Sequence, residues 1–204
     1  MPAASPPLKG MKVLELAHVM AGPTCGRILA DMGAEVIKLE RLDGEDCRRM
    51  APPWQDDQAA GFLILNRNKR GIAVNLKDPR GRQIVIDLAK ECDVVVENFR
   101  RGTMDRLGIG YEDLKSVNPG LIFCEISGYG RTGPYADKRG FDLVAQAMSG
   151  VMSVTGEGPT RPPVKAGVPV GDIGAGLYAV MGILAAYINK MQTGLGQRVE
   201  TSLF

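Results

Sequence analysis

KVLELAHVMAGPTCGRILADMGAEVIKLE, residues 12–40, is the stretch of sequence that decides the fold. Residues 12–16 are mostly apolar, as in a short strand, and residues 22–32 carry apolar side chains at helical spacing up to Gly33. Residues 35–40 then alternate apolar and charged side chains, which predicts a second strand. The three segments together predict a β-α-β unit, whose two strands are parallel neighbours.

The sequence that follows repeats this alternation. A strand is predicted at residues 71–76, and a helix at residues 79–91 with Asp78 as its N-cap and Pro79 at its first position. Residues 93–98 (DVVVEN) predict a strand that is buried on both faces, because three consecutive valines suit a parallel sheet covered by helices.

The rest of the chain continues the pattern up to its last residues. The further predictions are strands at 121–127 and 198–203, helices at 103–107, 111–117, 142–148 and 172–191, and loops at 41–57 and 150–170. The fold class is therefore α/β, with a parallel sheet. Right-handed crossovers place the loops at 17–23, 98–102 and 128–140 along one edge of the sheet, where open α/β folds bind ligands. No further strand follows 198–203, so we expect the chain to be cut rather than finished.

Composition and charge exclude several classes of function. Twenty-five basic and 23 acidic residues give a net charge of +2, which is too balanced for a nucleic-acid surface. No run of 18 apolar residues is present, and the first ten residues lack the apolar core of a signal peptide. Four scattered cysteines form no CxxC pair, so we expect reduced thiols. These features predict a cytoplasmic protein without membrane contact.

The turn after the first strand carries AGP in place of a dinucleotide-binding GxGxxG motif, and no P-loop is present. This turn fits either a close approach to a nucleotide or a tight connection without a ligand. Basic residues recur at strand ends and in loops. Singly they suit solvated surface charges, but together they suit an extended anion such as CoA. They are Lys38, Arg41, Arg67, Lys69, Arg70, Lys77, Arg100, Arg101, Arg106, Arg131, Lys138 and Arg139.

Asp172, within VPVGDIGAG, is the candidate nucleophile. It fits an ordinary helix N-cap equally well, although Gly174 and Gly176 would leave room for a substrate to approach its carboxylate. His18 is the only histidine, so neither a catalytic triad nor a histidine-based metal site is expected.

Five long segments carry a resemblance to a known family, in the family's order and spacing. They are LKGMKVLELAHVMAGPTCGRILADMGAEVIKLE, NRNKRGIAVNLKDPRGR, DVVVENFRRGTMDRLGIGYEDLKSVNPGLIFCEISGYGRTGPY, DLVAQAMSGVMSVTGE and GVPVGDIGAGLYAVMGILAA. The chain resembles the N-terminal half of class III CoA-transferases of the CaiB/BaiF type, the superfamily of formyl-CoA transferases and α-methylacyl-CoA racemases. The resemblance implies a Rossmann-like parallel sheet with flanking helices.

The resemblance also implies the chemistry. CoA would move from an acyl-CoA donor to a carboxylic acid acceptor through a mixed anhydride and then an aspartyl-CoA thioester, both formed on the family aspartate, which corresponds to Asp172. No metal is implied. The family's CoA contacts correspond to His18, Val19, Met20, Ala21, Arg41, Val74, Asn75, Leu76, Lys77, Asn98, Phe99, Arg100, Arg106, Arg139 and Asp142.

Alternatives on the same scaffold are a racemase, a CoA lyase and a non-catalytic CoA-binding module. Racemisation is disfavoured because Phe141 stands where the related racemases resemble one another in having a catalytic histidine. Met20 stands where formyl-CoA transferases have glutamine, which speaks against formate and oxalate. By this resemblance residues 1–204 are the N-terminal part of the large CoA-binding domain, and the second, smaller domain, with its acceptor-acid pocket, is missing. The full-length protein would form an interlocked homodimer.

Overall fold

The computed structural model describes residues 5–50, 52–158 and 160–204. Within them, six strands form one sheet in the order β5-β2-β1-β6-β7-β8, and every pair in it is parallel. The strands are β1 (Lys12–Glu15), β2 (Glu35–Glu40), β5 (Lys69–Ala73), β6 (Val94–Glu97), β7 (Ile122–Ser127) and β8 (Arg198–Ser202). The α/β fold with a parallel sheet and flanking helices is confirmed.

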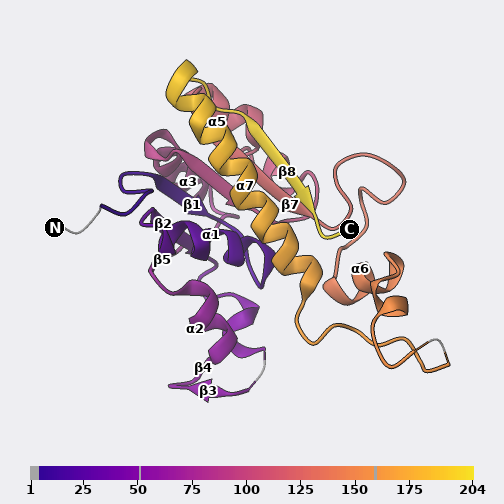
Figure 1. The fold of residues 1–204 in the computed structure, drawn as a ribbon. Helices are drawn as coiled ribbons and strands as arrows, with labels where there is room; N and C mark the ends of the chain where they lie inside the picture. Colours follow the sequence, from indigo (N-terminus) through magenta and orange to yellow (C-terminus); the bar gives the residue numbers. More distant parts are fainter. Residues whose placement is uncertain (1–4, 51, 159) are drawn as a thin grey trace.

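Helices cover both faces of this sheet (Figure 1). On one face α1 (Ala21–Asp31) and α7 (Val170–Thr193) pack over Val94 and Val96. On the other face α3 (Pro79–Glu91), α4 (Thr103–Arg106) and α5 (Tyr111–Val117) pack over Val95. The valine run therefore supplies side chains to two apolar layers, as its lack of alternation predicts.

Smaller elements lie at the ends of the sheet. The segment after β2 contains the 3-10 helix η1 (Asp46–Arg49), the β3 (Trp54–Gln55) and β4 (Gln58–Ala59) hairpin and α2 (Ala60–Asn66), which project together from the sheet (Figure 1). Helix α6 (Asp142–Met148) and the 3-10 helix η2 (Val151–Val154) precede α7.

Several predicted boundaries are wrong. The ordered loop predicted at 41–57 also contains the short elements η1 and β3. The strand predicted at 71–76 is β5, which ends at Ala73, so that residues 74–76 leave the sheet. Helix α7 begins at Val170 rather than at 172. β8 pairs with β7 as the edge strand of the sheet.

The expectation that no segment is long and apolar enough to cross a membrane is also wrong. Helix α7 meets this criterion by length and composition, with a mean hydropathy of 1.5 over its best 18-residue window. One such helix is a weak indicator, because core helices of soluble proteins share this composition. The inner face of α7 is buried, with Ala175, Ala179 and Ile183 packed in the core that it shares with α1 and the sheet.

Candidate functional site

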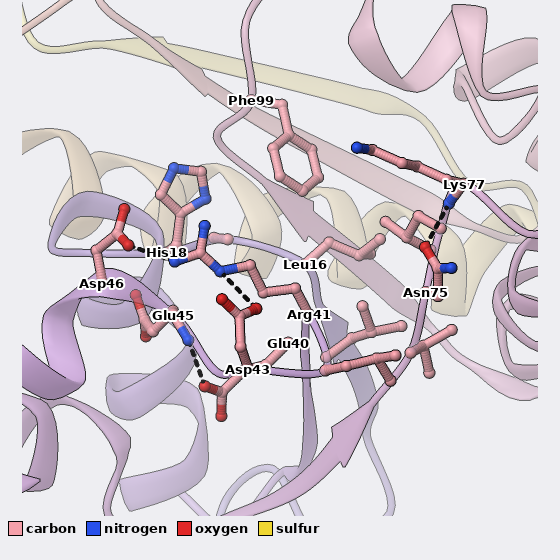
Figure 2. Close-up of a pocket in the computed structure, with 15 residues that line it drawn as sticks. Leu16, His18, Glu40, Arg41, Asp43, Glu45, Asp46, Asn75, Lys77 and Phe99 are labelled. Atoms are coloured by element: carbon pink, nitrogen blue, oxygen red, sulfur yellow. Dashed lines mark hydrogen bonds and ion pairs between the residues drawn. The ribbon is translucent and has the colours of Figure 1, made fainter.

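A cavity of about 570 Å³ lies at the carboxyl ends of β1, β2 and β5, the edge that the topology predicts for a ligand. Its walls include seven of the predicted CoA contacts, which are His18, Arg41, Val74, Asn75, Leu76, Lys77 and Phe99. The structure thus brings together residues from four separate segments, which follow β1, β2, β5 and β6. Figure 2 shows Asn75 and Lys77 across the cavity from Glu45 and Asp46.

The aromatic and basic groups of the cavity could hold different parts of a nucleotide. The rings of His18 and Phe99 lie 5.5 Å apart, so the two make one apolar side of the cavity. Burial lowers the pKa of His18, which therefore stays neutral at pH 7. Lys77 is exposed, and its backbone N–H donates to the Asn75 side chain at 3.1 Å. It offers a positive charge at the open end of the cavity.

Acidic residues that the sequence reasoning did not single out line the same cavity. They are Glu40, Asp43, Glu45 and Asp46. The Arg41 guanidinium pairs with Asp43 at 3.1 Å and with Asp46, and the side-chain hydrogen bond with Asp46 raises the pKa of Arg41. An anion that binds Arg41 would have to share it with these carboxylates. The only signal for this in the sequence is the acidic LDGED run directly after Arg41.

The other predicted CoA contacts do not line this cavity. Val19, Ala21 and Asn98 belong to or brace the turn beside it, and Met20 packs on the small cluster formed by Cys47, Phe62 and Leu65. Arg100 and Arg139 are exposed in loops, and the Arg106 side chain donates to the Thr103 hydroxyl at 3.1 Å. Gly22 brings the start of α1 against β1, since a Cβ atom there would lie 2.1 Å from the Ala17 Cβ. This close approach is therefore to the protein's own Ala17 side chain.

Asp142, the first residue of α6, lies apart from the cavity and contacts the start of α7, the helix that carries Asp172. Its Oδ1 accepts hydrogen bonds from the backbone N–H groups of Gly171, at 2.7 Å, and of Asp172, at 3.3 Å. The N-cap residue of α7 is Pro169, which has no side-chain acceptor. Asp142, which lies 30 residues before Asp172 in the chain, therefore caps the start of α7. The interpretation of Asp172 as the N-cap residue is wrong.

The Asp172 carboxyl group is consequently available for chemistry. No hydrogen bond or ion pair from the described part of the chain reaches its oxygens. Burial, together with the negative charge of Asp142, raises its pKa to about 6. A carboxylate that is desolvated and unpaired is more basic and more nucleophilic than an exposed one.

The glycines near Asp172 have two different roles. A Cβ atom at Gly174 would meet nothing within 4 Å, which leaves open space one helical turn from the start of α7. At Gly176 a Cβ atom would lie 2.7 Å from the Ala21 carbonyl oxygen, so this glycine lets α7 contact the start of α1. The first turn of α7, which carries Asp172, therefore lies close to the β1–α1 connection that borders the cavity. A second cavity, of about 590 Å³, lies between α7 and β8 and includes Gly171 and Gly174 in its walls.

Two buried carboxyl groups, one at the end of β6 and one within β7, were not predicted. Burial and the neighbouring Glu125 raise the pKa of Glu97 to about 8, while Glu125 pairs with Arg131 and Arg198. In residues 5–50, 52–158 and 160–204 no group of three or more His, Cys, Asp or Glu side chains is placed to hold a metal ion. All four cysteines are buried as free thiols.

Comparison with known proteins identifies the scaffold. The model of CoA-transferase family III matches residues 8–204. A succinate–glutarate CoA-transferase of Agrobacterium fabrum is 48% identical over 100% of this chain and 52% of its own length. The human succinyl-CoA:glutarate CoA-transferase is 46% identical over 97% of this chain and 45% of its own. The chain thus spans about half the length of these curated relatives.

A solved structure agrees with this identification. A CaiB/BaiF family protein from Brucella suis superposes with a TM-score of 0.94 at 46% identity, over 97% of this chain and 53% of that protein. The superposition includes the whole sheet and its helices. This chain therefore corresponds to about half of the Brucella suis protein, as expected for an N-terminal half.

Proposed function

The chain belongs to CoA-transferase family III, and from this premise we propose that it moves CoA from an acyl-CoA donor to a small carboxylic acid, with Asp172 as covalent nucleophile. The observation that carries the proposal is the state of the Asp172 carboxyl group. It is partly buried, its pKa is raised to about 6, and the helix start around it is held by Asp142 instead of by its own oxygens.

The proposed reaction proceeds in steps that conserve every group. An Asp172 carboxylate oxygen attacks the thioester carbonyl, the carbon–sulfur bond breaks, and a mixed anhydride and the CoA thiolate result. The thiolate then attacks the Asp172 carbonyl carbon, which releases the donor acid and leaves an aspartyl-CoA thioester. The acceptor carboxylate attacks the carbonyl carbon of this thioester, which breaks the carbon–sulfur bond, releases the CoA thiolate and forms a second mixed anhydride. The thiolate then attacks the acceptor's carbonyl carbon, which gives the new acyl-CoA and frees the Asp172 carboxylate. The positive end of the α7 dipole favours each anionic state.

The cavity at the carboxyl ends of β1, β2 and β5 is proposed to hold the nucleotide part of CoA. Its volume of about 570 Å³ suits a nucleotide, and the His18 and Phe99 rings offer an apolar side for a base. Arg41 and Lys77 are the cations nearest to where phosphates would lie. The contact of Gly176 with the start of α1 brings the first turns of α7 close to the turn that borders this cavity.

The names of the relatives suggest the acid. The proteins from Agrobacterium fabrum and human are a succinate–glutarate and a succinyl-CoA:glutarate CoA-transferase, so we propose succinyl-CoA as donor and a dicarboxylate of glutarate size as acceptor. The racemase alternative gains no support from the structure, because Phe141, at 58% exposure, brings no acid or base.

The state of the full-length protein is part of the proposal. We propose a cytoplasmic, interlocked homodimer in which residues outside this chain cover the outer face of α7. That face exposes Leu177, Tyr178, Met181, Ile188 and Met191, more apolar surface than one helix usually leaves in water. Sedimentation of the full-length protein at micromolar concentration should give a dimer, and a stable monomer would contradict this part of the proposal.

The transfer activity is tested by exchange of CoA between succinyl-CoA and glutarate in the full-length protein, followed by chromatography of the acyl-CoA products. Asp172→Ala should abolish exchange and leave CoA binding within about threefold of the wild type, since nucleophile and nucleotide contacts are separate groups. Asp137→Ala, at an exposed position outside the site, is the matched control and should retain full exchange. Exchange by Asp172→Ala at the wild-type rate would refute the proposal.

A further inference from the structure

The turn between β1 and α1 is built by side chains from other parts of the fold. The Ala17 carbonyl oxygen accepts from the Lys38 ammonium at 2.9 Å. Asn98 holds His18 at two points, accepting from its backbone N–H at 2.9 Å and donating to its carbonyl oxygen at 2.8 Å. The Val19 N–H donates to Glu45 Oε2 at 2.6 Å. The shape of the turn therefore depends on distant side chains more than on its own sequence.

Val19 shows why the turn needs this support. Its φ angle is +67°, in the left-handed region that β-branched residues avoid. A conformation of this kind persists only where the surroundings fix it. The N–H group of Val19 is fixed by Glu45, which also lines the cavity together with His18.

Glu45 is itself held from behind by a chain of buried charges. Its Oε1 lies 2.8 Å from the Lys38 ammonium, which lies 3.0 Å from Glu15, and Glu15 is 2.7 Å from Lys69. The side chains of Lys38, Glu15 and Glu45 are 3%, 0% and 5% exposed. Burial pushes the pKa of Lys38 down, but the two glutamates outweigh it and keep the pKa above its ordinary value. The two lysines and two glutamates alternate along this chain of contacts, which holds the Glu45 side chain in a fixed position.

We propose that Glu45 is a positioning residue for acyl-CoA, which holds the backbone of Val19 in its left-handed conformation and so keeps the His18 wall of the cavity in the form that binds the ligand. The inference rests on the proposed function, because it assumes that CoA occupies this cavity. Glu45 acts through the backbone of Val19. Because the turn is already formed in the free protein, no further loss of conformational entropy in this turn opposes ligand binding.

The test uses four variants of the full-length protein, with CoA as the probe in titration calorimetry. Glu45→Ala removes the acceptor and should weaken CoA binding by about tenfold or more, while kcat at saturating acyl-CoA changes by less than about twofold. Glu45→Gln keeps one oxygen that can accept from the Val19 N–H, although its amide NH2 group then faces the Lys38 ammonium, so this variant should lose less affinity than Glu45→Ala. Glu91→Gln, at an exposed glutamate outside the site, is the control and should bind like the wild type.

The decisive variant is Glu45→Ala combined with Val19→Gly. Glycine adopts positive φ without strain, so it should restore most of the lost affinity, which a general loss of stability would not allow. Wild-type affinity in Glu45→Ala, an equal loss in Glu45→Gln, or no recovery by Val19→Gly would each overturn the inference.

Hydrogen exchange of the ligand-free wild type provides a second measurement that needs no variant. The Val19 amide should exchange slowly before CoA is added, since its acceptor is buried. Fast exchange at the Val19 amide in a protein that binds CoA overturns only the proposed role of Glu45 and leaves the proposed function standing. A protected Val19 in a protein that binds no CoA refutes the proposed function and, with it, the inference.

Discussion

Replacement of Asp172 by asparagine should stabilise the protein while it removes the proposed nucleophile. The folded structure raises the pKa of Asp172 from 3.8 to about 6, first through burial and then through the charge of Asp142. The folded protein therefore binds this proton more tightly than the unfolded chain does. The carboxyl group favours folding most below pH 3.8, and this advantage is lost as the pH rises from about 4 to about 6.

The size of the effect follows from the shift. The rise of the pKa from 3.8 to about 6 corresponds to roughly 3 kcal/mol in the free energy of unfolding. Because Asp172 is only partly buried, solvent screening reduces this expected contribution to about 1–3 kcal/mol. At pH 7.5 Asp172→Asn should raise the free energy of unfolding by this amount. Near pH 4 the gain should vanish, since the wild-type carboxyl group is then protonated in the folded protein.

Urea unfolding followed by circular dichroism at pH 7.5 and pH 4 measures the difference. Asp137→Asn, at an exposed site, is the control and should change stability by less than about 0.5 kcal/mol at either pH. The reasoning would be refuted if Asp172→Asn were no more stable than the wild type at pH 7.5, or if its gain were as large at pH 4.

Three further predictions concern Asp172, the buried pair of Lys38 with Glu45, and the hydrogen bond between Gln146 and Asp142. The rate of acyl transfer to Asp172 should rise about tenfold per pH unit below pH 6 and level off above it, and a pH-independent single-turnover rate would contradict the pKa of about 6. Lys38→Met should lower the free energy of unfolding by about 3–5 kcal/mol in urea, because it leaves Glu45 buried without its partner; a loss below 1 kcal/mol would speak against a buried network. Gln146→Ala removes the hydrogen bond that its amide donates to Asp142 at 2.6 Å and should destabilise by about 1–3 kcal/mol in thermal unfolding, so an unchanged melting temperature would count against it.

The parts of the fold that follow from local patterns could be predicted from the sequence. The β-α-β unit and the buried strand around Val95 depend on periodicity within a few residues, and the structure has both. Helix α2 was missed, because its apolar run AGFLILN is short and comes soon after the polar segment 41–57, which indicates a loop.

The misses at the site have a different physical cause, which is contact between residues far apart in sequence. The start of α7 at Val170 depends on Asp142, and rules for helix caps consider only neighbouring residues. The acidic wall of the cavity was overlooked in the same way. Glu45 gains its role only beside Lys38 and Val19, and no spacing in the sequence indicates that contact.

The measurement that tests the central claim most directly is mass spectrometry of the full-length protein, quenched during turnover with an acyl-CoA and digested. We predict a covalent adduct on the peptide that contains Asp172, which hydroxylamine converts to a hydroxamate at that residue. Steady turnover with an unmodified Asp172 peptide at every quench time would contradict the claim.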